Sequence, residues 1–400
     1  MNQLQQKIIE RIRAEGPLPF ETFMEMVLYE PGIGYYASNT IEIGKAGDFY
    51  TSQHVHPAFG TIVAKQLIEM WEAMGRPSNF YAIEPGAGAG LMCLDILQYL
   101  QNEPIFPSLT YLIVETNNSV VLKQQNILKK YADKVRWTSS LRTAGNRKGC
   151  ILSNELLDAF PVHLIEMDKE LKEVYVDLKK NGHPPSPPFR KAGSEGFLEK
   201  GRKVDFLQIP FEEMKGAPST DAIVDYLHEF SIQLPAGYRT EINLRIKDWL
   251  QSAADVLSEG FILTIDYGYP SQEYYSEERN RGTLLCYYRH QVHEDPYTNI
   301  GYQDITAHVN FSSVKKWGEL FGFRTLGFCR QGTYLISLGI DGIIKKLYTD
   351  SPDYLFEVAQ IKRLIFPGTL GETHKVMVQY KGKGNPQLQG FSMKNQAEKL

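Results

Sequence analysis

The sequence predicts an α/β protein with a doubly wound sheet, and three observations lead to that class. Short apolar segments rich in β-branched residues alternate with segments of helical spacing between residues 80 and 153. A turn with glycine at every second position follows the first of these apolar segments. The same kinds of segment return near residue 247, after a stretch rich in proline and glycine. Such alternation predicts parallel strands whose connecting helices cover both faces of a sheet.

Each element follows from its local pattern. The break at Gly16-Pro17-Leu18-Pro19 divides residues 3–30 into two short helices, and apolar side chains three and four residues apart predict a helix over 56–75. Further helices are expected at 91–101, 118–131, 247–257 and 312–320. Seven strands are expected, at 80–84, 110–114, 134–138, 149–153, 260–265, 324–329 and 374–380.

Composition argues against several classes of protein. A net charge of −4 disfavours broad electrostatic binding of nucleic acid. No apolar segment reaches the roughly 18 to 20 residues that would span a bilayer. The first 15 residues form an acid-containing amphipathic pattern, unlike a secretory signal or a mitochondrial presequence, so we expect a cytoplasmic, bacterial protein. The four cysteines are scattered without metal-binding or redox spacing, and we expect no metal site.

The turn after the first strand, Glu84-Pro85-Gly86-Ala87-Gly88-Ala89-Gly90, predicts a cofactor site. Glycine lets the backbone turn sharply and approach a ligand, and the helix start that follows offers unpaired N–H groups. The spacing differs from the G-x-G-x-x-G turn of dinucleotide-binding proteins, and no Gly-Lys-Ser/Thr of a P-loop follows. An acidic residue followed by alternating glycines is typical of S-adenosylmethionine (SAM) methyltransferases. We therefore expect the Rossmann-like fold of class I SAM methyltransferases, with SAM as cofactor.

Other side chains are expected to complete the SAM site. Glu115 ends the second strand, about 25 residues after the glycine turn, where an acid accepts hydrogen bonds from ribose hydroxyls. The alternative is that Glu115 is a solvated acid at a strand end. Glu84 is expected to fix the turn or to bind the methionine amino group. Asn154, after the fourth strand, is also assigned to the cofactor, and Asp48 and Thr51 are expected to close over it.

These elements divide the chain into five predicted parts. Residues 1–54 form an N-terminal helical segment that covers the cofactor, and 55–175 and 247–380 form the two parts of the SAM-binding core. Residues 176–246 are an insertion between the fourth and fifth strands, on the acceptor side. Residues 381–400 are a polar tail that we expect to be loose.

The segment Ser153-Asn154-Glu155-Leu156-Leu157-Asp158 follows the fourth strand and carries two carboxylates. Glu155 and Asp158 are three residues apart, which would place them on one face of a helical turn. Beside the positively charged sulfonium of SAM, such a pair could hold a cationic or amine acceptor. The competing interpretation is structural: Asn154 or Asp158 caps a turn and Glu155 is solvated.

Asp304 and His308 form a second candidate pair, four residues apart. They could act as a base and the group that orients it, or ligate a metal. Two ligands without a nearby third are weak support for a metal site. The simplest interpretation is a capping Asp304 and a packed His308.

Several motifs together resemble the MidA-like SAM-dependent methyltransferases, a family that includes the mitochondrial arginine methyltransferase assisting assembly of respiratory complex I. The motifs span most of residues 15–380, and the most specific are SNELLDAFPVH at 153–163 and QDITAHVNF at 303–311. The others are LYEPGIGYY at 28–36, GDFYTS at 47–52, EPGAGAG at 84–90 and IDYGY at 265–269. The chain departs from the family inside the glycine turn, at Ala87 and Ala89.

This resemblance implies methylation of arginine in a protein substrate, with a respiratory complex I-type subunit as one candidate. It places Glu155 where arginine methyltransferases bind the guanidinium, and Asp158 and then Glu241 are candidates for a second acid. Two alternatives stay open: a small-molecule O- or N-methyltransferase, and a SAM-binding assembly factor without turnover. Labelled methyl groups in the small-molecule fraction, and not in protein, would indicate the first alternative. An inactive Glu155 variant that still supports the cellular function would indicate the second.

Overall fold

The computed structural model describes residues 1–38, 55–179, 210–348 and 352–400. Its main sheet consists of β2 (Phe80–Pro85), β3 (Leu109–Val114), β4 (Val135–Thr138), β5 (Arg147–Asn154), β10 (Leu257–Tyr269), β14 (Val309–Asn310), β15 (Arg324–Arg330) and β16 (His374–Lys381). The order is β15-β16-β10-β5-β2-β3-β4, and the short β14 adds to β10. From β4 to β10 the neighbours pair in parallel, whereas β16 is antiparallel to both β10 and β15.

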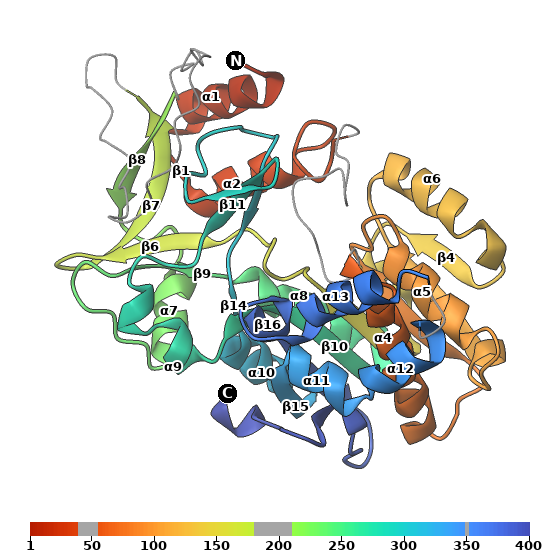
Figure 1. Cartoon of the computed structure of the whole chain (residues 1–400). Coiled ribbons are helices and arrows are strands. Elements are labelled where there is room, and N and C mark those ends of the chain that lie inside the picture. Colours follow the sequence, from red (N-terminus) through yellow and green to blue (C-terminus); the bar gives the residue numbers. More distant parts are fainter. Residues whose placement is uncertain (39–54, 180–209, 349–351) are drawn as a thin grey trace.

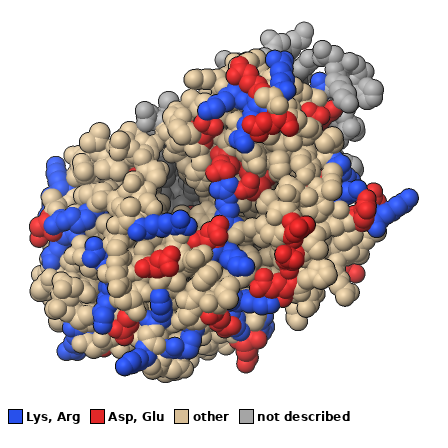
Figure 2. Space-filling view, turned by 180° about the vertical axis from the view of Figure 1, so that it is seen from behind, with Lys and Arg blue, Asp and Glu red and all other residues tan. Residues whose placement is uncertain are grey.

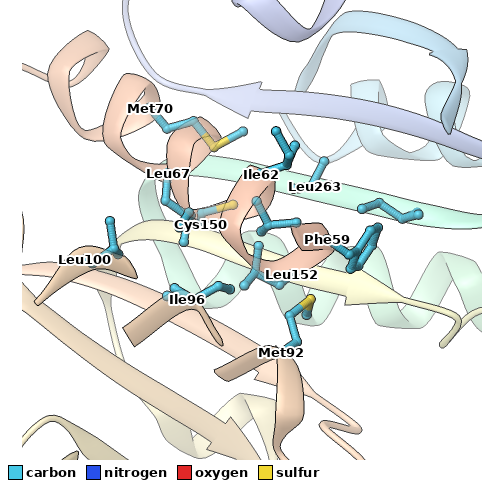
Figure 3. Packing of buried hydrophobic residues seen from close by; sticks show 14 of the residues in the cluster. Phe59, Ile62, Leu67, Met70, Met92, Ile96, Leu100, Cys150, Leu152 and Leu263 are labelled. Atoms are coloured by element: carbon cyan, nitrogen blue, oxygen red, sulfur yellow. The ribbon is translucent and has the colours of Figure 1, made fainter. Parts of the chain in front are cut away.

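Helices pack on both faces of this sheet because its strands are apolar on both sides. Along β2, Ala82 faces one hydrophobic core and Ile83 the other. The first core lies under α4 (Ala58–Ala73), α5 (Leu91–Leu100), α11 (Gln331–Ser337), α12 (Ile340–Tyr348) and α13 (Tyr354–Ile365). The second lies under α8 (Arg245–Val256) and α10 (Phe311–Leu320). Figure 3 shows α4 and α5 side chains packing onto Cys150, Leu152 and Leu263 of the sheet. The α/β class expected from the sequence is confirmed.

A second sheet stands beside the first (Figure 1) and is built mostly from the chain between β5 and β10. Its strands are β1 (Leu18–Pro19), β6 (His163–Met167), β7 (Leu171–Leu178), β8 (Phe211–Gly216) and β9 (Arg239–Ile242), in the order β1-β7-β6-β9 with β8 on β7. The two expected N-terminal helices, α1 (Gln3–Glu15) and α2 (Phe20–Tyr29), pack on this sheet. Strand β6 of this sheet lies within residues 55–175, which the sequence analysis assigned to the SAM-binding core.

Smaller elements complete the fold. A third sheet has the order β12-β11-β13, from β11 (Leu285–Tyr288), β12 (Gln291–His293) and β13 (Asp304–Thr306). The remaining α-helices within the described residues are α6 (Asn118–Ile127), α7 (Asp221–Glu229), α9 (Ser271–Tyr274) and α14 (Leu370–Thr373). Asp48, Thr51 and the proline-rich stretch at 181–203 lie outside the described residues.

On the face in Figure 2, positive and negative side chains are interspersed. Within the described ranges, no helix is both long and apolar enough to cross a membrane.

The expectation of a loose C-terminal tail is wrong. Leu388 and Phe391 are buried in the first core, where the Phe391 ring centroid lies 5.5 Å from that of Tyr334. The Asn395 side chain accepts a hydrogen bond from Phe328 N and donates one to a neighbouring carbonyl of β15. The prediction was wrong because it relied on the polar composition of the tail as a whole. Burial of two large apolar side chains is enough to order a short segment.

Replacing Phe391 by alanine should lower the free energy of unfolding by about 3 kcal/mol, because it removes a buried ring and leaves a cavity. Urea denaturation of the full chain measures this. Met393, which is exposed in the same segment, provides the control. Its replacement by alanine should change the free energy by no more than about 0.5 kcal/mol. Equal effects for the two variants would contradict the anchoring of the tail.

Candidate functional site

The glycine turn lies at the carboxyl edge of the parallel strands, where open α/β sheets bind ligands. Gly86, Gly88 and Gly90 all have positive φ, of 66°, 53° and 81°, a conformation that favours glycine. Gln124 of α6 holds the turn: its Nε2 donates to Gly88 O at 2.8 Å, and its Oε1 accepts from Trp137 Nε1 at 2.9 Å. Gly90 caps α5 without a side-chain hydrogen bond, so the first N–H groups of the helix are available to an external acceptor.

Two carboxylates flank this turn, as the sequence predicts. Glu84 is buried and accepts a hydrogen bond from Tyr111 Oη at 2.6 Å. Burial raises the pKa of Glu84 to about 7, against the opposing effect of that hydrogen bond. Glu115 is half-buried, its Oε1 accepts from Asn117 N at 2.8 Å, and burial raises its pKa. Asn117 Nδ2 in turn donates to Ala37 O, which brings the N-terminal segment to the tip of β3.

Asn154 ends β5 at the same edge. Both polar atoms of its side-chain amide are buried and have no hydrogen-bond partner among the described residues. The same holds for Ser153 Oγ. Buried polar atoms in native proteins are almost always hydrogen-bonded, to protein, water or ligand. The Asn154 amide, at the carboxyl end of β5, therefore marks a place where a bound molecule would find a polar donor and acceptor.

The loop after β5 carries a cluster of buried acids. Glu155 has a φ of 47°, and its side chain is only 5% exposed. Asp158 is 4% exposed, and its Oδ1 has no hydrogen-bond partner within the described part of the chain. Burial raises the pKa of Asp158 well above its usual range, and the nearby carboxylates of Asp266, Glu155 and Asp304 raise it further. The structure thus brings the two acids predicted from SNELLDAFPVH together and adds two more.

Asp266, at the end of β10, fixes this loop. Its Oδ2 accepts hydrogen bonds from Leu156 N and Leu157 N, and its Oδ1 accepts from Tyr267 N. Burial raises the pKa of Asp266 to about 8, although the three backbone N–H groups favour its ionised form. The side chain holds the backbone of the loop that presents Glu155.

Two tyrosines from the N-terminal segment form a wall beside the acids. Tyr36 Oη donates to Asp304 Oδ1 at 2.7 Å, and Tyr29 Oη donates to Ala159 O at 2.9 Å. Their rings stack with centroids 5.4 Å apart. Both tyrosines belong to the LYEPGIGYY segment, so this motif positions the acid loop and β13.

His308 packs against aromatic rings. Its ring lies nearly parallel to that of Tyr267, at 6.0 Å, and 5.4 Å from that of Tyr269. Its Nδ1 has no hydrogen-bond partner among the described residues. Burial, together with nearby positive charge, lowers the pKa of His308 to about 4. A neutral, stacked His308 and an Asp304 bound to Tyr36 favour the packing interpretation over a base and its orienter.

Glu241 is fully occupied by contacts within the protein. Its carboxylate accepts hydrogen bonds from Thr283 N, Thr283 Oγ1, Leu284 N and Tyr274 Oη, at 3.0 to 3.3 Å. A Cβ on Gly282 would lie 2.0 Å from Glu241 Oε1, so only glycine allows this approach. These contacts tie β9 to the segment before β11. Because the Glu241 carboxylate is occupied, Asp158 is the better candidate for the second acid that binds the acceptor.

His374 belongs to the site but was not predicted. Its ring is fully buried, and its Nε2 lies 3.3 Å from Glu155 Oε1, within ion-pair distance but without the alignment of a hydrogen bond. Because β16 is antiparallel, its first residue lies at the edge where the parallel strands end, opposite Tyr267. That strand direction is the signal that could have identified it.

The described residues contain no group of three or more His, Cys, Asp or Glu arranged to hold a metal ion. The four cysteines are free and buried. The residues do fit SAM: a glycine turn, the start of α5, a carboxylate at the tip of β3 and the unpartnered Asn154 amide line one edge.

Comparisons with known proteins identify a family and a cofactor. Residues 62–329 match the model of a family described as "Putative S-adenosyl-L-methionine-dependent methyltransferase". The chain is 24% identical to the mitochondrial protein arginine methyltransferase NDUFAF7 homolog of Drosophila melanogaster, covering 95% of this chain and 85% of the relative. It is 25% identical to the mitochondrial NDUFAF7 of Bos taurus, covering 91% and 80%.

A solved structure is similar over nearly the whole chain. It is a protein from Burkholderia thailandensis bound to S-adenosyl-homocysteine, with a TM-score of 0.84 and 27% identity, covering 99% of this chain and 96% of that one. S-adenosyl-homocysteine (SAH) is SAM without the transferred methyl group. The chain therefore belongs to the MidA-like SAM-dependent methyltransferases and uses SAM as its cofactor.

Proposed function

We propose that this methyltransferase transfers the methyl group of SAM to a guanidinium nitrogen of arginine in a protein. The observation that carries the proposal is the buried acid cluster beside the SAM edge, with Asp158 Oδ1 unpartnered among the described residues. A cluster of acids suits a cationic acceptor, because such an acceptor relieves their mutual repulsion. The relatives named protein arginine methyltransferases support the same acceptor, at 24% and 25% identity.

Glu155 is proposed to bind the guanidinium, with Asp158 as the second acid. A guanidinium is planar, carries five N–H donors and stays charged at physiological pH. A carboxylate can therefore hold it through two parallel hydrogen bonds and keep its charge away from the attacking nitrogen. When bound, SAM supplies the methyl group, and the contribution of the protein is to hold the nitrogen near attack distance, about 3 to 3.5 Å. Tyr36 and Asp304 would form the adjoining wall.

The cofactor contacts are proposed from the same edge. Glu115 would accept hydrogen bonds from the ribose hydroxyls, and the turn of Gly86, Gly88 and Gly90 with the start of α5 would lie against the ligand. The Glu84 carboxylate would bind the methionine amino group of the cofactor. The Asn154 amide would supply both a hydrogen-bond donor and an acceptor. Asp48 and Thr51 keep the covering role predicted from the sequence. A cytoplasmic location and a respiratory complex I-type acceptor also stay predictions.

The affinity for SAH should rise with pH between about pH 5.5 and 7. The pKa of Glu84 is raised to about 7, so below that value its carboxyl is mostly protonated in the free protein. An ammonium group binds the ionised form, so binding must release a proton, and each pH unit lost below 7 costs up to about tenfold in affinity. The α-ammonium group of SAH is that of a free amino acid and keeps its proton throughout this window, so the ligand adds no opposing change.

Calorimetry with SAH in two buffers of different ionisation heat measures both the affinity and the proton release. Glu84→Gln should bind more weakly and show little pH dependence in this window. A pH dependence equal to that of the wild type would show that another group is responsible, with Asp266 the first to examine.

Incubation with radiolabelled SAM and a cell lysate tests the proposed function. We expect label in protein and, after hydrolysis, in methylarginine, with mass spectrometry identifying the labelled protein. Label confined to the small-molecule fraction would instead support the small-molecule methyltransferase, and methylation of another side chain would refute the arginine assignment.

A further inference from the structure

Methyl transfer to a guanidinium releases one proton in every turnover, and the acid cluster that would receive it is buried. As the nitrogen electron pair forms the N–CH3 bond, the C–S bonding pair stays on sulfur. One N–H bonding pair then returns to nitrogen as its proton leaves, so the methylated guanidinium keeps a single positive charge. The Glu155 side chain is only 5% exposed in the described part of the chain, so a proton on it is largely shielded from bulk water. A proton left on Glu155 would neutralise the group proposed to bind the next acceptor.

His374 lies between Glu155 and the surface. One ring nitrogen, Nε2, is 3.3 Å from Glu155 Oε1, and the other, Nδ1, is 3.2 Å from Thr373 Oγ1. The His374 ring is buried, whereas Thr373 is exposed. The two nitrogens of one imidazole therefore face a buried acid on one side and an exposed hydroxyl on the other.

The Thr373 hydroxyl can set the tautomer of His374. It has one proton, and its Oγ1 lies 3.3 Å from Thr369 O and 3.2 Å from His374 Nδ1. When the hydroxyl donates to Thr369 O, Nδ1 donates to the hydroxyl and the lone pair of Nε2 faces Glu155. When the hydroxyl turns to donate to Nδ1, Nε2 carries the proton instead. Rotation of a surface hydroxyl thus accompanies a proton shift across the ring.

We propose that His374, acting through Glu155, carries the proton lost by the acceptor nitrogen to solvent at Thr373. The inference rests on the proposed arginine methylation. Glu155 takes the proton from nitrogen and passes it to Nε2 of His374, and Nδ1 then releases its own proton through the Thr373 hydroxyl to water. His374 is a positioning residue in this scheme, because it acts through Glu155 and not on the acceptor.

The other titratable groups around His374 are less suited to this step. The Tyr267 ring lies 4.0 Å from the His374 ring, and burial raises the pKa of Tyr267 well above its usual range. His308 is neutral, because burial lowers its pKa to about 4. Lys375, next in the chain, donates its Nζ to Glu372 O and Thr373 O, and burial lowers its pKa to about 8. Among the described residues, Glu155 and His374 link the acid cluster to an exposed hydroxyl through contacts of 3.3 and 3.2 Å.

His374→Gln in the full chain separates proton transfer from packing, because glutamine can donate to Glu155 but cannot titrate. The acceptor is the protein fraction of a lysate from cells that lack this chain, with tritiated SAM, and the rate of methylarginine formation is measured from pH 6 to 9. The wild-type rate should rise with pH and then level off. The variant should be slower by about 100-fold and lose that rise, while its Kd for SAH stays within about twofold.

Two further variants distinguish a role of His374 in proton transfer from a role in packing alone. His374→Ala should regain at least about tenfold in rate with added imidazole, which can enter the space left by the ring. Thr373→Val should slow the reaction several-fold with an unchanged KM. The control is His228→Gln, an exposed histidine on α7, which should behave as the wild type.

The outcomes distinguish the two proposals. If the wild type forms methylarginine and His374→Gln keeps its rate and pH profile, the proton route is refuted and arginine methylation stands. Absence of imidazole rescue in a folded His374→Ala that binds SAH also counts against the route. If the wild type forms no methylarginine at any pH, the proposed function fails and the proton route fails with it.

Discussion

Replacing Glu155 by glutamine should reduce methyl transfer by about 1000-fold while leaving the affinity for SAH within a few-fold. Glutamine is nearly the same size as glutamate, so the loop held by Asp266 should keep its shape. The amide has no negative charge and replaces one acceptor oxygen with a donor, so it cannot hold a guanidinium through two parallel hydrogen bonds. Tritium transfer into protein measures turnover, and calorimetry with SAH measures cofactor binding.

The matched control for this variant is Glu170→Gln, which makes the same chemical change at an exposed position in the turn between β6 and β7. It should retain wild-type activity. If the affinity of Glu155→Gln for SAH falls together with turnover, Glu155 contributes to cofactor binding or to folding, and its assignment to the acceptor is wrong.

Replacing Glu115 by alanine should weaken SAH binding about 10- to 100-fold. This corresponds to the loss of hydrogen bonds to a charged acceptor, about 1.5 to 3 kcal/mol. The change also removes the acceptor for Asn117 N, so the start of α6 could loosen. Glu115→Gln keeps an oxygen for that N–H group and should show a smaller loss. Calorimetry with SAH on both variants separates the contribution of the charge from that of the local fold.

Asp133→Ala is the control for Glu115, because it removes an exposed acid just before β4, away from the carboxyl edge of the sheet. It should bind SAH like the wild type. If Glu115→Ala also binds SAH like the wild type, Glu115 is the solvated strand-end acid that the sequence left as an alternative.

Local patterns were enough to predict the parts of the fold that depend on nearby residues. The glycine turn, the strand before it and Glu115 after the next strand form a compact signature, because backbone geometry and sheet edge fix their relation. The same holds for Glu155 and Asp158, which share one loop. The N-terminal helices followed from a helix-breaking segment.

The rest depended on contacts between distant segments. Glu241 resembles a free acid in the sequence, and only the approach of Thr283 and Leu284 shows that its carboxylate is occupied. His374 stands 219 residues after Glu155, and their meeting depends on the antiparallel direction of the last strand. The anchoring of the tail through Phe391 depends likewise on core space next to Tyr334.

The backbone of Glu155 carries a cost that the rest of the protein must offset. A non-glycine residue with a φ of 47° is strained by about 1 kcal/mol or more, and here it also places a carboxylate among other buried acids. A substitution at this position that relaxes the loop would therefore tend to raise the thermal stability of the protein and, at the same time, to abolish its turnover. Selection for heat resistance alone would act against catalysis here, so thermostable versions of this enzyme would have to gain their stability elsewhere.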